Sequence, residues 1–503
     1  MRKQFFILGF TLLIITALVY YYLKIGFLLL VILPILLVIG YYNSVQKKHA
    51  ILRNFPVLGY ARYLFELIAP EIQQYFIERS TDGKPFSRNE RSLVYQRAKN
   101  IDSNTPFGTQ LDLNQNHYEG IKHSIFPSVV NEDLPRVWVG GADCKQPYHA
   151  SLLNISAMSF GSLSENAIMA LNKGAQKGHF YHNTGEGGLT EFHLQGGDIT
   201  WQIGTGYFGC RTAEGTFDAG KFSEKSNLPS VKMIEIKLSQ GAKPGHGGVL
   251  PAAKNTEQIA KIRGVQPNIT IFSPPSHSAF KDSKGLISFI KELRTLSNGK
   301  PIGFKLCIGD TAEFESLCIE MIAADCYPDF ITVDGAEGGT GAAPLEFSDG
   351  VGMPFEPALI FVNKTLIAYK IRDKIRVIGS GKIISGYAVL RAIALGADLC
   401  NSARGFMFSL GCIQALRCHN NQCPTGVATQ DKMLMKGLVV TDKFERVFHF
   451  HKNTLHAANE LLAATGKTSF ADMDISIFMR GDEFSHLSDL YFPDNLRKHT
   501  TLQ

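Results

Sequence analysis

Short apolar runs separated by amphipathic stretches follow one another from about residue 150 to residue 401. We expect strands at 154–157, 179–183, 233–238, 269–272, 302–306, 330–333, 376–378 and 398–401. Helical spacing of apolar residues lies between most of them, for example at 256–263, 285–293, 311–324 and 385–395. This alternation predicts an α/β fold, a (β/α)8 TIM barrel, with a doubly wound parallel sheet as the alternative. The stretch 187–230 is too long for a simple loop, so we expect extra structure there, over the barrel mouth.

The start of the chain is almost entirely apolar. Residues 5–23 and 25–42 carry no charge, and only Lys24 separates them. At about 1.5 Å per residue, each run just spans a hydrocarbon core of about 30 Å, which predicts a hairpin of two transmembrane helices. The basic flanking residues are Arg2, Lys3, Lys47, Lys48 and Arg53. The positive-inside rule then places both ends in the cytoplasm, with the catalytic domain facing the cytoplasm from the inner membrane. A cleaved signal peptide is the alternative.

The composition of the 503 residues excludes a disordered chain, since 45% are hydrophobic and 19% charged. The net charge of +6 comes with no basic run, so we expect no nucleic-acid partner. We predict four parts: transmembrane helices at 1–45, a mixed or helical segment at 46–145, the barrel at 146–430, and a helical segment at 431–503. In the second part, 60–75 has helical spacing that Pro70 is expected to break.

Glycines cluster directly after the expected strands. The clusters are Gly185, Gly187 and Gly188, then Gly241, Gly245, Gly247 and Gly248, then Gly335, Gly338, Gly339 and Gly341, then Gly379, Gly381 and Gly386. Barrel ligands bind at the carboxyl ends of the strands, and glycine lets backbone N–H groups approach a phosphate closely. The clusters therefore favour a phosphate-bearing cofactor, with ordinary tight turns as the alternative.

Three of the nine cysteines lie within a short segment, with the spacing C-x5-C-x4-C. They are Cys412, Cys418 and Cys423, and Pro424 follows the last of them. Thiolate-rich runs that end in Cys-Pro are typical of iron–sulfur sites, and three thiolates suit a [3Fe–4S] cluster. A [4Fe–4S] cluster with one open iron, a zinc site that recruits His419, and three buried free thiols are the alternatives. The scattered cysteines are interpreted as packing residues.

A further group of polar residues lies near the expected third strand. Lys237, Gln240 and Lys243 occur in IEIKLSQGAKPGHGG, and Arg263 follows them. Cations together with an amide suit a dicarboxylate substrate, and solvated surface lysines are the alternative.

Two single residues are further candidates. Lys305, in the apolar run IGFKLC, is expected to point into the barrel mouth or to pair with a carboxylate. Glu186, between glycines, could handle a proton or an ammonium, or be structural.

The ordered stretches NISAMSFGSLSENA, NTGEGG, IEIKLSQGAKPGHGGVLP, IFSPPSH, DGAEGGTGAAP, GSGKIISG and GCIQALRCHNNQCPTGVATQ lie between about residue 150 and residue 430. This region resembles the FMN-binding central and synthase region of the glutamate synthases, and its last stretch is similar to their [3Fe–4S] signature. With its hydrophobic start and ILRNFPVLGYARY, the whole chain resembles the membrane-anchored, stand-alone FMN-binding glutamate synthase family proteins.

The resemblance implies a barrel that holds FMN with a [3Fe–4S] cluster beside it. In that family 2-oxoglutarate and ammonia form 2-iminoglutarate, and reduced FMN delivers a hydride to give glutamate. Gln240, Lys243 and Arg263 would bind 2-oxoglutarate, with Lys243 nearest the chemistry. Glu186 would lie by the flavin where ammonia enters, and Lys305 would face the pyrimidine end of the flavin. The other implied FMN contacts are Ser156, Ala157, Met158, Lys237, Gly339, Thr340, Gly341, Gly379, Gly381, Ala403 and Arg404, and the implied cluster ligands are Cys412, Cys418 and Cys423.

The chain also departs from the family pattern. No glutaminase region is evident, so we expect nitrogen to arrive as free ammonia, as an amine, or from a partner. No NAD(P)H fingerprint is evident either, so we expect electrons from another protein or a membrane pool. His246 replaces a family glutamate and Glu337 a family aspartate, both beside the implied substrate pocket. The rival functions are a membrane-tethered flavin and iron–sulfur electron-transfer module, and a non-enzymatic scaffold with a degenerate barrel.

Overall fold

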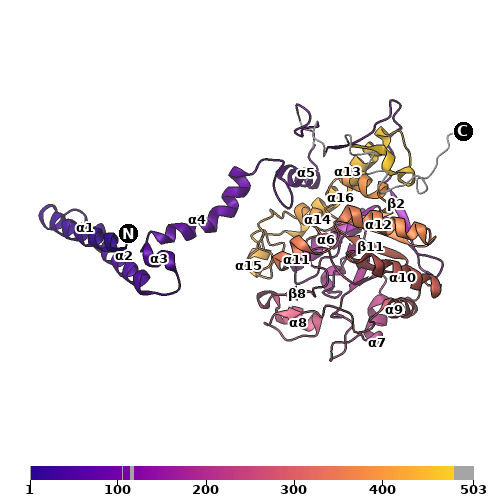
Figure 1. Ribbon diagram of the computed structural model, residues 1–503, viewed down its shortest axis with the longest axis horizontal. Coiled ribbons are helices and arrows are strands. Elements are labelled where there is room, and N and C mark those ends of the chain that lie inside the picture. The colour runs from indigo at the N-terminus through magenta and orange to yellow at the C-terminus, as the bar shows by residue number, and fades with distance from the viewer. Residues whose placement is uncertain (1, 103, 105, 114–117, 481–503) are drawn as a thin grey trace. The chain divides into compact units, whose positions relative to one another are not determined.

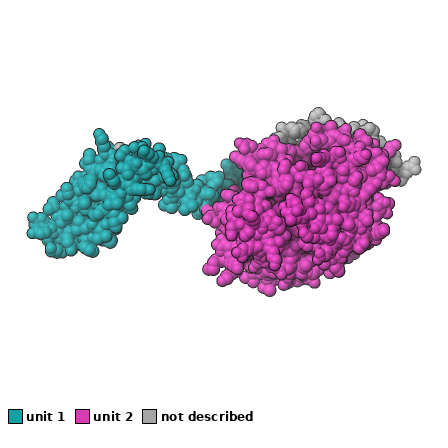
Figure 2. Space-filling model, turned by 90° about the horizontal axis from the view of Figure 1, so that it is seen from below, with its two compact units in different colours: residues 1–88 teal, residues 89–503 magenta. Residues whose placement is uncertain are grey.

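The computed structural model describes residues 2–102, 104, 106–113 and 118–480. It divides the chain into two compact units, residues 1–88 and 89–503 (Figure 2). The first unit consists of α1 (Arg2–Leu23), α2 (Phe27–Val45), α3 (Ala50–Asn54), α4 (Gly59–Ile72) and the π-helical turn η1 (Gln73–Ile77).

The two apolar runs form an antiparallel helical hairpin. Lys24 and Gly26 reverse the chain in the left-handed region, with φ of 55° and 90°. A Cβ atom at Gly9 would collide with Leu37, and one at Gly40 with Phe5, so the glycines let α1 and α2 pack closely. Both helices are long and apolar enough to cross a membrane, with hydropathies of 2.1 and 2.2.

The expected break at Pro70 is wrong in position. α4 continues through Pro70 to Ile72, and the distortion follows as the π-helical turn Gln73–Ile77. Proline cannot donate a backbone hydrogen bond, and a helix can absorb that loss in a locally wider turn without ending.

The second unit is built around a closed barrel of parallel strands, which confirms the (β/α)8 prediction and overturns the doubly wound alternative (Figure 1). In chain order the barrel strands are β4 (Leu153–Ile155), β5 (His182–Asn183), β6 (Ile199–Ile203), β7 (Val231–Lys237), β10 (Ile302–Leu306), β11 (Phe330–Asp334), β12 (Arg376–Ser380) and β13 (Leu399–Ser402). β13 pairs with β4 and closes the ring.

One expected barrel strand is wrong and one was missed. The run at 269–272 gives only β9 (Ile271–Phe272), which pairs with β8 (Val249–Leu250) outside the barrel. The third barrel strand is β6, within the stretch 187–230 that was expected to cover the mouth. β6 is fully buried, but Thr200 and Gln202 interrupt its apolar pattern, so periodicity did not reveal it. Lys237 therefore ends the fourth barrel strand, not the third.

Amphipathic helices surround the barrel. They are α6 (Glu165–Gly178), α7 (Ala219–Ser226), α9 (Ser283–Leu296), α10 (Thr311–Ala323), α12 (Phe355–Ala368) and α13 (Gly386–Ala394). Five of them begin at a Ser or Asp whose side chain accepts a backbone N–H of the first turn, as good N-caps do. The long helix α16 (Val440–Ala464) packs against α6 and α13.

Smaller elements complete the second unit. The helices are α5 (Arg88–Ala98), α8 (Glu257–Arg263), α11 (Leu345–Gly350), α14 (Arg404–Ser409) and α15 (Lys432–Met435), with the 3-10 turns η2 (Glu191–His193), η3 (Ala252–Lys254), η4 (Phe470–Asp472) and η5 (Ile475–Ile477). Two further antiparallel pairs join β1 (Glu119–Ile121) to β14 (Phe478–Arg480) and β2 (Arg136–Val139) to β3 (Tyr148–Ser151). Of the helical segment expected at 431–503, residues 481–503 lie outside the described residues.

Candidate active site

Polar side chains lie inside the barrel at two depths, because alternate residues of each strand point inward. Glu235, on β7, lies at the deeper level and is only 1% exposed. Its carboxylate accepts hydrogen bonds from Asn183 Nδ2 (2.8 Å), Gln202 Nε2 (2.7 Å) and Thr332 Oγ1 (2.6 Å). One carboxylate thus ties β5, β6 and β11 to β7.

Replacing Glu235 should loosen the barrel. Each buried donor left without an acceptor lowers the free energy of unfolding by about 1–3 kcal/mol. Glu235→Ala would leave three donors without their acceptor. We expect a clear fall in the thermal unfolding temperature, followed by circular dichroism, and a smaller fall for Glu235→Gln. Glu445→Ala, which removes an exposed pair with Lys177, should change little. Equal unfolding temperatures for Glu235→Ala and Glu445→Ala would contradict this role.

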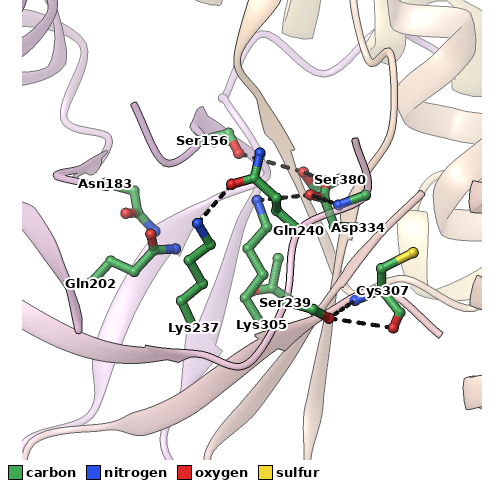
Figure 3. Close-up of polar contacts among 12 residues, drawn as sticks. Ser156, Asn183, Gln202, Lys237, Ser239, Gln240, Lys305, Cys307, Asp334 and Ser380 are labelled. Atoms are coloured by element: carbon green, nitrogen blue, oxygen red, sulfur yellow. Dashed lines mark hydrogen bonds and ion pairs between the residues drawn. The ribbon is translucent and has the colours of Figure 1, made fainter. Parts of the chain in front are cut away.

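Two lysines occupy the upper level, toward the carboxyl ends of the strands. Lys237 and Lys305 are register partners on the neighbouring strands β7 and β10, and they stand side by side (Figure 3). Lys237 Nζ lies 2.6 Å from Glu186 Oε1 and 2.7 Å from Gln240 Oε1. Lys305 Nζ lies 3.2 Å from Asp334 Oδ2. Each ammonium therefore has its own carboxylate, which permits two buried cations on adjacent strands.

Asp334, which the sequence reasoning missed, organises one side of the mouth. Besides Lys305, its carboxylate accepts the backbone N–H of Gly241 at 2.9 Å and Ser380 Oγ at 3.0 Å. Ser380 Oγ lies 3.4 Å from Ser156 Oγ, so the network crosses the mouth from β10 to the residues after β4 (Figure 3). A carboxylate at the end of the predicted strand FITV was the available signal.

Glu186 lies at the centre of the other side. Burial would raise the pKa of its carboxyl, but Lys237, Lys243 and Arg263 outweigh burial and lower it. A Cβ at Gly204 or Gly248 would come within 2.7 Å and 2.6 Å of its carboxylate oxygens, so glycines leave the room that it occupies. Three cations surround one carboxylate, an excess of two positive charges.

Lys243 and Arg263 are buried cations with few partners. Lys243 is 3% exposed and donates to the carbonyl of Ala342 at 2.8 Å. Burial, together with Lys237, lowers the pKa of Lys243 to about 8. Arg263 donates to the carbonyl of Phe160 at 3.0 Å, while its buried Nε has no hydrogen-bond partner in the described part of the chain. Burial lowers the pKa of Arg263 to about 10. These donors fit an anionic ligand.

His277, in the stretch IFSPPSH, holds the end of β7 in place. Its Nε2 lies 2.9 Å from the carbonyl of Lys237, and its Nδ1 lies 3.0 Å from the hydroxyl of Tyr207. A carbonyl only accepts, so Nε2 carries the proton and Nδ1 accepts from Tyr207. Burial lowers the pKa of His277 and favours this neutral form.

The two departures from the family pattern, His246 and Glu337, both form hydrogen bonds with backbone groups. His246 Nδ1 lies 2.8 Å from the carbonyl of Gly247, and its ring meets Phe347 edge-on. Glu337 Oε2 accepts the backbone N–H of Phe355 at 3.0 Å. Glu186 and Asp334 are the carboxylates that neutralise Lys237 and Lys305.

The residues expected around a ribityl phosphate follow β11, β12 and β13. A Cβ at Gly379 would lie 2.9 Å from Phe355, and one at Gly381 would also collide with Phe355, so these glycines admit a phenylalanine ring. Arg404 Nη2 donates to the carbonyl of Glu337 at 2.7 Å and joins the loops after β11 and β13.

The other expected cofactor contacts lie around the same mouth. Gly339 lies against Arg404, and Thr340 is exposed beside Gly341. Ser156 and Met158 are buried after β4, with Ala157 between them, and Ala403 precedes α14.

The three clustered cysteines lie between α14 and α15 and interact electrostatically with one another. Burial raises the pKa of Cys412 to about 12 and also raises that of Cys418. Among the described residues, no three His, Cys, Asp or Glu side chains converge as the ligands of a single ion do. In an iron–sulfur cluster each thiolate can bind a different iron, so the ligands of a cluster need not converge on a single ion.

Cys423 has the environment of a thiolate ligand. Burial raises the pKa of its thiol, but hydrogen bonds from the Thr425 side chain and from the backbone N–H groups of Ala428, Thr425 and Val427 lower it overall. Such donors stabilise a negatively charged sulfur and tune a bound cluster. The cysteine segment is anchored by Tyr95, whose hydroxyl donates to the carbonyl of Cys412 at 2.6 Å.

Lys254, also missed from the sequence, is buried beside these cysteines. It is 2% exposed, its Nζ donates to the carbonyl of Ser162 at 2.7 Å, and no carboxylate among the described residues pairs with it. Burial lowers its pKa to about 8, against the opposite effect of Cys418 and Cys423. Asn421 Nδ2 donates to the carbonyl of the preceding Ala253 at 3.1 Å and fixes the cysteine segment to this turn.

Comparison with known proteins shows the family. The conserved region in glutamate synthase matches residues 128–468. The chain belongs to the glutamate synthase family. All of the candidate residues described above lie inside the matched region, apart from Tyr95.

Curated members of the glutamate synthase family match over different lengths. The chain is 38% identical over 484 residues to the glutamate synthase large subunit-like protein YerD of Bacillus subtilis, covering 88% of this chain and 92% of that protein. It is 33% identical over 321 residues to the archaeal glutamate synthase [NADPH] of Methanocaldococcus jannaschii. That match covers 63% of this chain and 60% of the relative, so the chain spans less than two thirds of the archaeal enzyme.

One solved structure aligns with most of this chain. The flavin-binding domain of baker's yeast flavocytochrome b2 aligns with a TM-score of 0.43 and 14% identity over 83% of this chain and 85% of that chain.

Proposed function

We propose that this protein is a glutamate synthase-type oxidoreductase that reductively aminates 2-oxoglutarate, or a related 2-oxo acid, with ammonia or an amine. The product would be glutamate or an N-substituted glutamate, and the proposed cofactors are FMN and a [3Fe–4S] cluster. The observation that carries the proposal is the group of Lys237, Lys243 and Arg263 around Glu186 at the barrel mouth.

The charge of this group matches the substrate. The two excess positive charges equal the charge of a dicarboxylate, which guanidinium and ammonium groups bind through charge-assisted hydrogen bonds. Gln240 adds an amide beside Lys237. Among the described residues Lys243 Nζ donates to the carbonyl of Ala342 alone, so it has further N–H donors for a carboxylate or a carbonyl oxygen.

Proton handling falls to Glu186 and Lys243. The lowered pKa keeps Glu186 ionised, so its carboxylate can orient an ammonium or accept a proton as ammonia adds to the carbonyl carbon. Loss of water from the adduct requires an acid, and Lys243, with its pKa lowered to about 8, can give a proton at neutral pH.

The barrel mouth offers a fitting donor set for FMN. Lys305, Ser380 and Ser156 line one network, and Arg404 brings a guanidinium to the loops after the last strands, where barrels bind phosphate. When bound, FMN supplies the hydride and exchanges single electrons with a cluster. These residues would hold FMN and the 2-oxo acid near the carboxyl ends of β7 and β10.

We place the protein at the inner membrane, with α1 and α2 as a transmembrane hairpin and the barrel facing the cytoplasm. The length and apolarity of both helices support this placement, as do the flanking basic residues. The electron donor would be a separate protein or membrane pool.

A single-turnover experiment tests the proposal. The full chain, purified without oxygen in detergent, is chemically reduced and mixed with 2-oxoglutarate and ammonium while flavin absorbance and glutamate are followed. Flavin reoxidation with stoichiometric glutamate is expected. A protein without flavin would overturn the proposal. Bound flavin that stays reduced with every 2-oxo acid and amine tried would instead favour an electron-transfer module.

Substrate binding should weaken at alkaline pH. The Lys243 ammonium is present below its pKa of about 8 and lost above it, whereas a dicarboxylate stays doubly charged. The Kd of 2-oxoglutarate, measured by calorimetry without ammonia, should rise about tenfold per pH unit above that value. Lys243→Arg should remove this rise, since guanidinium stays charged. A Kd that is flat across this range in the wild type would contradict the assignment.

Lys254 should raise the reduction potential of the cluster, because a buried cation stabilises the more negative reduced state. Lys254→Met should lower the midpoint potential by at least about 59 mV, which is tenfold in the equilibrium constant for one electron. Lys254→Arg should restore most of it. The matched control is Lys300→Met, since Lys300 is also buried, with a pKa of about 8, and donates to the carbonyls of Ser226 and Leu228. Equal potentials in the Lys254→Met and Lys300→Met proteins would rule the role out.

A further inference from the structure

The helix α4 exposes an apolar side that nothing in the described part of the first unit covers. The exposed fraction is 57% at Leu64 and 37% at both Ile68 and Ile72, which recur at i, i+4 and i+8. Phe65 is 63% exposed beside them. We call these four residues the α4 apolar face.

A separate stripe of α4 is polar. Arg62 Nε and Glu66 Oε1 form an i,i+4 ion pair of 2.7 Å, with both side chains more than half exposed. Gln73, at the start of the π-helical turn, lies on the same side as this pair by helical spacing. This stripe is suited to water, while Glu71, at i+3 from Ile68, lies at the edge of the α4 apolar face.

Two hydrogen bonds fix the start of α4, one to the end of α2 and one to the segment that follows α2. Tyr60 Oη donates to Asn43 Oδ1 at 3.0 Å, and Asn43 is fully buried in the last turns of α2. Tyr63 Oη lies 3.4 Å from His49 Nδ1, and the two rings meet edge-on. α4 therefore begins at the level where the apolar helix α2 ends, which is the level of the membrane surface if α2 spans the bilayer.

The residues of α4 suit a position at the membrane surface. Its 14 residues are too few to cross a hydrocarbon core, and it carries Arg62, Glu66 and Glu71, which oppose insertion across it. Tyr60 and Tyr63 are residues that favour the headgroup region. The exposed basic residues Lys47, Lys48 and Arg53, between α2 and α4, attract anionic headgroups to the same place.

We propose that α4 lies in the plane of the membrane surface, with the α4 apolar face buried at the boundary between the headgroups and acyl chains of an anionic bilayer. This inference rests on the proposed membrane attachment of α1 and α2 and goes beyond it. The protein then has a second contact with lipid, made by an amphipathic helix between the hairpin and the second unit.

Photo-crosslinking in the full chain tests this placement. Benzoylphenylalanine is introduced singly at Leu64 or Ile68, and as matched controls at Arg62 or Gln73, in nanodiscs of phosphatidylethanolamine and phosphatidylglycerol. A further probe at Ile14, 61% exposed on α1, reports the hairpin itself. After illumination, mass spectrometry should find several-fold more phospholipid adduct at Leu64 and Ile68 than at Arg62 and Gln73.

The probe on α1 separates two kinds of failure. Lipid adducts at Ile14 without any preference between the two sides of α4 would overturn the α4 placement and leave the transmembrane hairpin intact. Adducts from Leu64 and Ile68 to a second copy of the chain, or to residues of the second unit, would also overturn the α4 placement. They would identify the protein surface that packs on the α4 apolar face instead. An absence of lipid adducts at Ile14 as well would overturn both the hairpin and the α4 placement.

Discussion

Lys243→Met should abolish nearly all glutamate formation while the flavin stays bound. Lys243 is buried among Lys237, Arg263 and Glu186, and methionine keeps its length and apolar stem but removes the charge and the proton. Loss of a positioned acid alone is worth about 10²–10⁴-fold in rate. The loss should appear in the single-turnover rate of flavin reoxidation by 2-oxoglutarate and ammonium, with a higher Kd for 2-oxoglutarate.

The control for this variant is Lys300→Met, another buried lysine that donates to backbone carbonyls, but away from the barrel mouth. It should keep the wild-type turnover rate if it folds, which the thermal unfolding temperature reports. Flavin content should be equal in both variants, because Lys243 bonds to none of the residues proposed to hold FMN. Wild-type turnover in Lys243→Met would remove Lys243 from the chemistry and with it the main support for a dicarboxylate substrate.

Cys423→Ser should eliminate the iron–sulfur cluster. Cys423 is buried, and its sulfur receives the hydrogen bonds that favour a thiolate. A serine hydroxyl stays protonated at neutral pH and is a poor ligand for iron in a thiolate cluster. Iron and acid-labile sulfide should fall to background, and the electron paramagnetic resonance signal of the oxidised cluster should disappear, with FMN retained.

Cys144→Ser is the matched control, since Cys144 is partly exposed and its thiol donates to the carbonyl of Gly299, as a serine hydroxyl can. It should keep the full cluster content. Stoichiometric zinc with little iron in the wild-type protein would favour the zinc alternative. Unchanged iron and sulfide in Cys423→Ser would exclude this cysteine as a ligand.

The barrel could be predicted because its signal is local. Short buried strands and amphipathic helices leave periodic patterns that each segment carries by itself, and seven of the barrel strands were found in this way. β6 was not, because its polar residues Thr200 and Gln202 face inward, and Gln202 bonds to Glu235 across the barrel. From sequence alone, a polar residue in a strand is interpreted as solvent-exposed, because the distant partner that would satisfy it inside the barrel is not known.

The active-site residues divide in the same manner. Spacing and the glycine-rich turns pointed to Glu186, Lys237, Lys243 and Lys305 one by one. Their pairing was decided by the tertiary structure, in which Glu186 forms an ion pair with Lys237 and Asp334 forms one with Lys305. The sequence had offered His246 and Glu337 as the notable changes, yet both bond to nearby backbone instead.

The sequence by itself determined the apolar hairpin, the alternation that closes into a barrel, and the residue types that gather at its mouth. Each follows from the order of side chains along a short stretch. Only the tertiary structure decided which carboxylate neutralises which lysine, that Arg263 reaches Glu186, and that Lys254 lies beside the cysteines. The physical reason is that charge and burial depend on neighbours brought from distant parts of the chain, and closing the barrel is what brings them together.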